Sequence, residues 1–266
     1  WETAMPNMGY MELLRNVRNM EESGVASDIL DIAASRLSDP QQIRDSRQMP
    51  LRFWSAAKAL SDSRTFESAL ESGLEVSTEA VPPLDGRTLI LVDQSGSMGV
   101  PYGGYRNIGD INVDSQATLG EVAALYGAAL AKRSKDVDLV MFGSSHHLAT
   151  DVKDSSILDS VRNHGSASLG GTNTWTALNE SFQNHDRVII LSDGQSNDRG
   201  SLPKGVPVHF FDLTGHSVSF ANDNSPNYYA YGGLSDLSFR LFAIMEGASN
   251  ASDELLTQER SKDEAS

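Results

Sequence analysis

One short stretch constrains the fold of this chain most: an apolar run over residues 88–92 that leads directly into Asp93-Gln94-Ser95-Gly96-Ser97. A continuous apolar run without alternation is typical of a strand buried on both faces of a parallel sheet. The pentad then ends the strand in one carboxylate and two hydroxyls. Because Gly96 can adopt positive φ, the chain can fold back at this point. We therefore expect a buried strand whose carboxyl end carries a cluster of oxygen donors.

The segments that follow alternate between patterns typical of helices and of strands. We expect strands over 137–142, 147–150, 188–191 and 206–211, and helices over 119–130, 157–161, 174–182 and 236–245. Such alternation predicts an α/β fold, a doubly wound and mostly parallel sheet flanked by helices. Ligands in that architecture bind at the carboxyl ends of strands, where Asp93 and Asp193 are both expected.

The first eighty residues have a different pattern, with apolar residues at helical spacing. Pro40 and Pro50 interrupt this spacing, and a last short helix is expected to end near Gly73. Four short helices bury little by themselves, so we interpret them as the end of a helical array. Pro82-Pro83 marks a boundary, because the residue before a proline disfavours the α region. We expect a helical segment over 1–80, an α/β domain over 81–249 and a disordered acidic tail over 250–266.

Two later segments supply oxygen donors that the pentad lacks for a complete cation site. Thr172 follows two glycines, and Asp193 follows the apolar run 188–191. Hydroxyl and carboxylate oxygens suit a small divalent cation such as Mg²⁺, with Mn²⁺ or Ca²⁺ as alternatives. We predict that Asp93, Ser95, Ser97, Thr172 and Asp193 hold this ion. The alternative is an ordinary strand-to-helix turn in which Ser95 or Ser97 merely caps a helix.

These five residues match the metal ion-dependent adhesion site of the von Willebrand factor A domain, which the chain resembles. The resemblance implies that Ser95, Ser97 and Thr172 ligate the metal directly, and that Asp93 and Asp193 hold it directly or through waters. It also implies that a partner protein offers an acidic side chain to the remaining position. The chain lacks a Gly-x-Ser-x-Gly frame and a phosphate-binding loop, so we expect a binding module and not an enzyme.

Further motifs resemble the bacterial branch of the TROVE family, named for telomerase, Ro and vault proteins. They are Leu-Leu-Arg-Asn-Val-Arg-Asn-Met at 13–20, Ser-Arg-Gln-Met-Pro-Leu-Arg-Phe at 46–53, Leu-Asp-Gly-Arg-Thr at 84–88, His-Asp-Arg at 185–187 and Leu-Ser-Asp-Leu-Ser-Phe-Arg at 234–240. The resemblance implies the end of a ring of HEAT-like repeats followed by an A domain. It further implies binding of Y-like or misfolded non-coding RNA, a part in RNA quality control and an exoribonuclease partner.

The charge of the chain restricts RNA binding to local surfaces. A formal net charge of −15 argues against a general nucleic-acid binder, because neutralisation of phosphates by Lys and Arg dominates such affinity. Basic residues outnumber acidic ones locally between Arg36 and Arg64, where the alternative interpretation is a set of solvated helix faces. Within this stretch we predict that Arg47 and Arg52 contact RNA.

Composition also bears on location and on competing functions. The chain has no cysteine, which fits a reducing compartment and favours the cytoplasm, and no apolar run long enough to cross a membrane. Residue 1 is Trp and not Met, so we expect sequence upstream of it. Two alternatives to the RNA interpretation are an A domain that recruits a partner to an ATPase or chelatase-type machine, and a metal site with a purely structural role.

Overall fold

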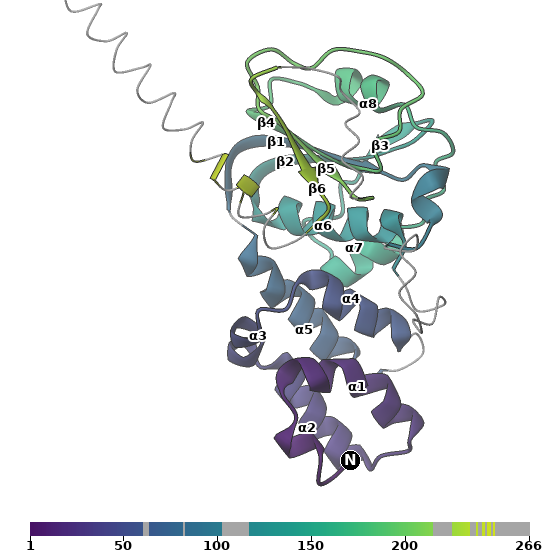
Figure 1. Cartoon of the computed structure of the whole chain (residues 1–266), viewed down its shortest axis with the longest axis vertical. Coiled ribbons are helices and arrows are strands. Elements are labelled where there is room, and N and C mark those ends of the chain that lie inside the picture. The colour runs from purple at the N-terminus through teal and green to yellow at the C-terminus, as the bar shows by residue number, and fades with distance from the viewer. Residues whose placement is uncertain are drawn as a thin grey trace, which may run out of the picture.

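The computed structural model describes residues 1–60, 64–81, 83–102, 117–214 and 225–234, together with Ser238, Leu241, Phe242, Ile244, Met245 and Gly247. Within these residues, a helical segment lies below a sheet domain in an elongated molecule (Figure 1). The predicted acidic tail over 250–266 and most of the glycine-rich loop after the pentad lie outside the described residues. The division of the chain at residue 81 stays a prediction.

The helical segment consists of α1 (Tyr10–Glu22), α2 (Ser27–Ser38), α3 (Pro40–Ser46), α4 (Pro50–Ala59) and α5 (Glu67–Ser77), with 3-10 turns η1 (Met5–Asn7) and η2 (Thr78–Ala80). Pro40 and Pro50 each begin a helix, because the first helical position needs no N–H donor. Asp39 caps α3 by accepting a hydrogen bond from the Gln42 N–H at 2.9 Å. The spacing of apolar residues did not predict α3, which is too short to show a period.

The expected end of the last helix near Gly73 is wrong, since α5 continues to Ser77. Gly73 lies inside the helix at a packing position, because a Cβ there would collide with the ring of the fully buried Phe53. Close contact between α4 and α5 therefore explains the glycine better than a chain break does.

The sheet domain contains strands β1 (Leu84–Asp93), β2 (Ser134–Phe142), β3 (His146–Leu148), β4 (Arg187–Ser192), β5 (Val208–Asp212) and β6 (Tyr228–Gly232), and helices η3 (Gly96–Gly99), α6 (Leu119–Arg133), α7 (Ile157–His164) and α8 (Thr174–Ser181). The strand order is β3-β2-β1-β4-β5-β6, and every neighbouring pair is parallel except β2 and β3. The predicted fold class is confirmed. Strand β6 was not predicted, because its tyrosine-rich sequence has no apolar run.

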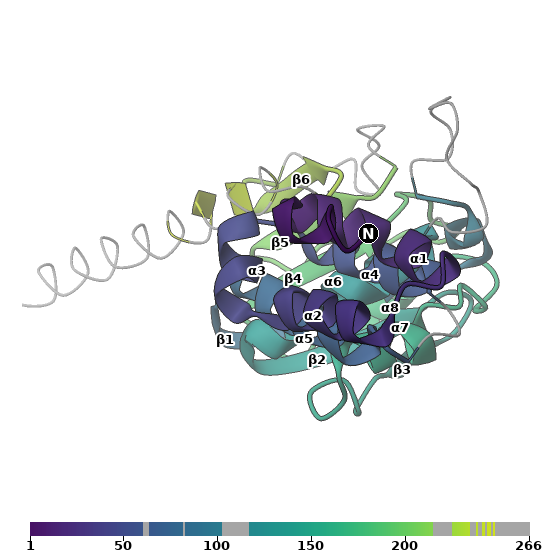
Figure 2. The same ribbon diagram turned by 90° about the horizontal axis from the view of Figure 1, so that it is seen from below.

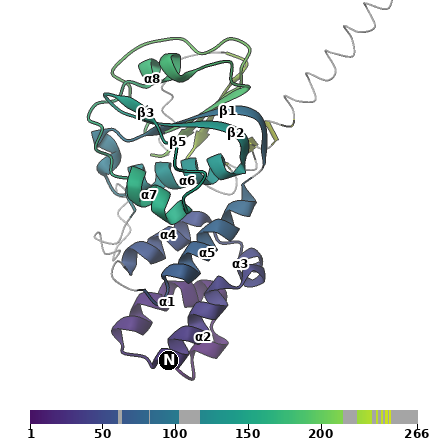
Figure 3. The same cartoon turned by 180° about the vertical axis from the view of Figure 1, so that it is seen from behind.

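Helices cover both faces of the sheet, as Figures 1 and 3 show. Helices α6 and α7 lie between the sheet and the helical segment, and α8 lies on the opposite face. Alternate residues of β1 enter different cores: Ile90 and Val92 join the core under α6, whereas Leu89 and Leu91 join the core under α8. Burial on both faces is the physical reason for the uninterrupted apolar run.

The helical segment packs directly under the α6 face of the sheet (Figure 2). Its apolar residues form one continuous cluster with those of α6 and α7. Polar contacts cross the same boundary: Lys58 Nζ lies 2.7 Å from Glu121 Oε2, and Glu75 Oε1 accepts from the Ile157 N–H at 3.0 Å. Glu121 also forms the capping box of α6 with Thr118. The start of α6 is thus held both by Lys58 of the helical segment and by its own cap, Thr118.

Among the described residues, no helix combines the length and the apolar character needed to span a bilayer.

We predict that Gly127→Ala weakens the packing of α6 on β1. A Cβ at Gly127 would lie 2.6 Å from Cγ2 of Val92, so helix and strand must separate, at a cost of about 1–3 kcal/mol. Urea unfolding followed by circular dichroism measures this loss. Gly232→Ala is the control, because no atom lies within 4 Å of the added Cβ there. Equal stability of the two variants would contradict the prediction.

Candidate metal centre

The acidic end of β1 is buried and fully hydrogen-bonded. Asp93 is 0% exposed; its Oδ1 accepts from the Ser95 N–H at 2.8 Å and its Oδ2 from the Ser192 hydroxyl at 2.6 Å. The hydroxyl oxygens of Ser95 and Ser97 lie 3.2 Å apart. Although Ser95 precedes η3, its side chain makes no capping hydrogen bond. The pentad therefore gathers its oxygen atoms at one place, and the capping interpretation of Ser95 lacks support.

The loop that carries Thr172 is hydrogen-bonded to the pentad. The Gly96 N–H donates to the Gly170 carbonyl at 2.6 Å, and the Leu169 N–H donates to the Gln94 carbonyl at 2.9 Å. The Gln94 side chain adds a third link, since its Oε1 accepts from the Ala167 N–H at 2.9 Å. Residues separated by about seventy positions in sequence are thereby fixed side by side.

The loop that carries Asp193 joins the same cluster. The Asn197 N–H donates to the Thr172 carbonyl at 2.7 Å, and Asp193 Oδ1 accepts from the Gln195 N–H at 3.0 Å. Thr172 and Asp193 are each 5% exposed. The three segments predicted to share a site are therefore hydrogen-bonded neighbours at the ends of β1 and β4.

The topology explains why the segments meet there. Strand β1 pairs with β2 on one side and with β4 on the other, and the register aligns Val92 with Leu191. The connection from β1 to β2 runs through α6 on one face, whereas α8 precedes β4 on the other face. The order of strands thus reverses at β1, and open α/β sheets bind ligands in the crevice at such a reversal.

The electrostatics of this crevice fit a cation. Burial raises the pKa of Asp93 to about 6, against the opposing effect of hydrogen bonds from Ser192 and Ser95, and the charge of Asp193 raises it further. Burial at this place therefore disfavours the negative charge that a bound cation would stabilise. Two carboxylates and three hydroxyls are all hard oxygen donors, which suits Mg²⁺. In the described part of the chain, no group of three or more His, Cys, Asp or Glu side chains offers another metal site.

Several supporting residues were not predicted from the sequence. Ser192 holds Asp93, and Ser144 Oγ accepts from the Gly171 N–H at 2.7 Å. Gln94 spans two loops, because its Nε2 donates to the Gly120 carbonyl at 2.9 Å while its Oε1 binds Ala167. Only Ser192 and Gln94 carried a local signal, as neighbours of predicted ligands. Ser144 acts through contacts that no sequence spacing reveals.

Asp198 links the Asp193 loop to the helix that follows Thr172. Its Oδ1 accepts from the Trp175 N–H at 3.1 Å, and its Oδ2 accepts from the Thr176 N–H at 2.7 Å and the Thr176 hydroxyl at 2.8 Å. Burial alone would raise the pKa of Asp198, but the hydrogen bonds from Thr176, Ser196 and Trp175 hold it below its ordinary value. A carboxylate on one loop thus caps the helix of the other.

The two arginines predicted to contact RNA lie away from this centre, in the helical segment. Arg47 ends α3 with φ of 52°, and Arg52 lies in the first turn of α4; both are exposed. Other cations of the same stretch have structural partners: Arg44 pairs with Glu79 at 2.7 Å, and Arg36 donates to the Met5 carbonyl. Among the described residues, Arg47 and Arg52 have neither a hydrogen bond nor an ion pair through their side chains.

Comparison with known proteins finds a family match for the helical segment. Residues 1–86 match the family described as the TROVE domain. We refer to these residues as the TROVE segment. Among curated proteins, the sequence finds no significant match.

The TROVE segment and the sheet domain together resemble a solved structure, the crystal structure of the Deinococcus radiodurans Ro (RSR) protein. The TM-score is 0.67 at 19% sequence identity, and the match covers 92% of this chain and 54% of that chain. At this identity the likeness establishes the fold, and this chain spans about half the length of the Deinococcus protein. The predicted recognition of a Ro-like TROVE chain is confirmed, whereas the metal ligands and RNA contacts stay predictions.

We predict that Asp198→Ala lowers the affinity for Mg²⁺ as well as stability. The variant loses the cap of α8, worth about 0.5–2 kcal/mol, and leaves the hydrogen bond from the Asn197 N–H to the Thr172 carbonyl as the remaining described link between the Thr172 and Asp193 loops. Isothermal titration calorimetry measures the affinity, and thermal unfolding without metal measures the stability. Asp39→Ala is a matched control, since it removes the cap of α3 outside the centre. Equal Mg²⁺ affinity in both variants would refute the linking role.

Proposed function

We propose that this chain is a non-enzymatic, divalent-metal-dependent binding module of a Ro-like RNA-binding protein. One observation carries the proposal: Asp93, Ser95, Ser97, Thr172 and Asp193 lie on segments joined by hydrogen bonds at the reversal of strand order. The burial of Asp93, Ser95, Thr172 and Asp193 gives a bound charge little solvent screening.

The chain's own residues have distinct parts in this proposal. Ser95, Ser97 and Thr172 offer hydroxyl oxygens, and Asp93 and Asp193 offer the negative charge. A bound Mg²⁺, Mn²⁺ or Ca²⁺ would offer its positive charge to a ligand at a coordination position that these five oxygen donors leave unfilled. An acidic side chain of a protein partner or a phosphate oxygen would be attracted to that charge. The hydrogen bonds to Gln94 and Ser192 hold the donors in place whether or not a partner is present.

The TROVE match supports RNA as the ligand of the whole protein. The proposed ligands are Y-like or misfolded non-coding RNAs, bound in RNA quality control together with an exoribonuclease. The absence of cysteine is consistent with work in the reducing cytoplasm. The TROVE match also favours this function over an A domain in an ATPase machine, because helices of that family precede the sheet domain.

The first test is metal-dependent stabilisation. We expect Mg²⁺ to raise the thermal midpoint, with a stabilisation of about 2.7 kcal/mol when free Mg²⁺ exceeds its Kd a hundredfold. Asp93→Asn should abolish this rise and also Mg²⁺-dependent partner binding, because it removes charge and retains an oxygen that can accept from Ser95. Differential scanning calorimetry with and without chelator measures the effect.

Asp212→Asn is the matched control for that test. Asp212 is equally buried at the end of the neighbouring strand β5, and its Oδ1 accepts from Thr214. This variant should respond to Mg²⁺ like the wild type. If Mg²⁺ does not change the thermal midpoint of the wild type, the metal centre is refuted. If partner binding persists in the presence of chelator, the role of the ion is structural.

The second test concerns RNA. We expect Arg47→Ala combined with Arg52→Ala to weaken RNA binding and to make it less dependent on salt. The slope of log K against log salt concentration should become shallower by about 0.7 for each phosphate of a single strand that is no longer neutralised. Fluorescence anisotropy over a series of salt concentrations measures both quantities. Arg44→Ala is the control, since Arg44 is exposed but paired with Glu79. Unchanged affinity and slope in the double variant would remove these arginines from the interface.

A further inference from the structure

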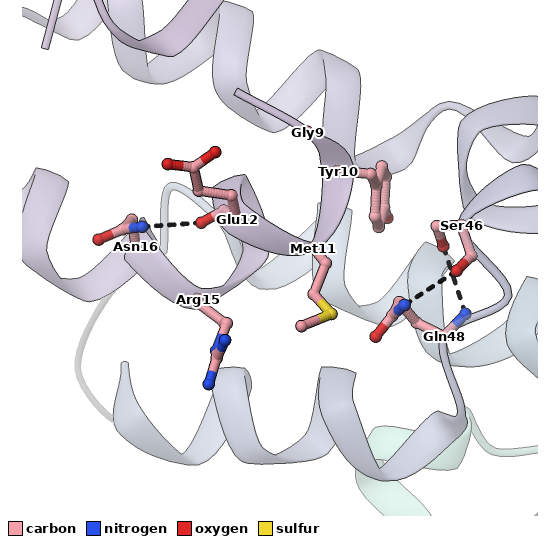
Figure 4. A pocket seen from close by; sticks show the side chains of 8 residues that line it. All are labelled: Gly9, Tyr10, Met11, Glu12, Arg15, Asn16, Ser46 and Gln48. Atoms are coloured by element: carbon pink, nitrogen blue, oxygen red, sulfur yellow. Dashed lines mark hydrogen bonds between the residues drawn. The ribbon is translucent and has the colours of Figure 1, made fainter. Parts of the chain in front are cut away.

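A cleft of about 650 Å³ opens in the TROVE segment, between the start of α1 and the connection from α3 to α4 (Figure 4). Its lining comes from Gly9, Tyr10, Met11, Glu12, Arg15 and Asn16 on one side and from Ser46 and Gln48 on the other. The volume falls within the range of about 300–1,000 Å³ that is typical of small-molecule sites. Neither the predicted metal ligands nor the two predicted RNA contacts line it.

An exposed apolar side chain lies in the cleft. Met11 is 43% exposed, although most large apolar residues of the described helices are buried. Tyr10 forms the adjoining wall: its hydroxyl donates to the Leu37 carbonyl at 2.7 Å and its ring lies 6.2 Å from that of Phe53, so it is fixed in position. A flexible thioether beside a fixed aromatic ring suits the flat face of a planar ligand.

Polar groups with unused bonding capacity surround this apolar part. Within the described residues, the exposed guanidinium of Arg15 makes no hydrogen bond or ion pair. Gln48 donates its Nε2 to the Ser46 carbonyl at 2.8 Å, which leaves its Oε1 to accept from a ligand. In Figure 4, Met11 and Arg15 point to the same side of α1, and the Glu12 carboxylate points to the other. The side that faces Gln48 is therefore cationic.

We propose that this cleft holds one nucleotide of single-stranded RNA. The base packs against Met11 and Tyr10, its edge donates to Gln48 Oε1, and the phosphate lies against Arg15. The inference rests on the proposed RNA-binding function and adds a defined nucleotide site to it. A base can enter such a cleft only when it is unpaired and unstacked, so duplex RNA is excluded as the occupant.

The charge of the surroundings supports an anionic ligand such as RNA over a basic peptide. Arg47 lies in the chain between the lining residues Ser46 and Gln48, and it is exposed and unpaired among the described residues. Arg15 and Arg47 are thus two separate cations near one apolar pocket. This arrangement matches the alternation of phosphates and bases along a single strand.

The test is fluorescence anisotropy of a short fluorescein-labelled oligouridine with the full chain. Arg15→Ala should weaken binding about five- to tenfold and reduce the logarithmic salt slope by about 0.7, the signature of one fewer phosphate neutralised on a single strand. Met11→Ala should weaken binding and leave the slope unchanged, because the contact with a base is uncharged. Unlabelled duplex RNA of the same sequence should compete poorly.

Each variant has a matched control. Arg18→Ala removes an arginine of the same helix that pairs with Glu22 at 3.6 Å, and Ile32→Ala removes an apolar side chain of α2 that is 50% exposed outside the cleft. Both should stay within about twofold of the wild type. Circular dichroism verifies that every variant is folded, which we expect because none of the four side chains is buried.

The outcomes separate this inference from the function on which it rests. A wild-type chain that fails to bind the oligonucleotide overturns RNA binding itself. Binding by the wild type with Arg15→Ala equal to Arg18→Ala overturns the nucleotide site alone. Strong competition by duplex RNA, or photocrosslinks from 4-thiouridine that map outside α1 and residues 46–48, also overturns it and leaves a peptide as the occupant to be sought.

Discussion

The pairing of β1 with β4 at the centre of the sheet is the contact on which the candidate centre depends. Parallel pairing in the register that aligns Val92 with Leu191 brings Asp93 within reach of Ser192, which donates to it at 2.6 Å. A shift of either strand by one residue would turn the side chains of that strand to the wrong faces. Two separate apolar cores oppose that shift, because alternate residues of each strand enter each core.

The centre costs stability that the rest of the fold must supply. Asp93 is buried near a second carboxylate, and burial raises its pKa to about 6. Hydrogen bonds from neighbouring loops keep this unfavourable arrangement in place, with Gln94 and Asp198 as the residues that tie those loops together. Such a cost at one place, supported by many contacts around it, is typical of sites selected for binding.

The TROVE segment and the sheet domain are in direct contact at the start of α6. Lys58 of α4 pairs with Glu121, and the carbonyl of the adjacent Gly120 accepts from Gln94 in the pentad. One apolar cluster runs through both parts. The cleft beside α1 and the candidate metal centre are thus parts of one packed structure.

The sequence by itself determined the fold class and the candidate ligands, because periodicity depends on local burial and because oxygen donors after apolar runs mark strand ends. It missed α3 and β6, which are too short or too polar to show a period, and it ended α5 early at Gly73, whose role is to admit Phe53. Only the tertiary structure decided that Asp198, Ser144 and Gln94 brace the centre, that Arg44 is paired while Arg47 is not, and that Met11 and Arg15 face a cleft. These features arise from contacts between residues far apart in the chain, and no local pattern of residues records such contacts.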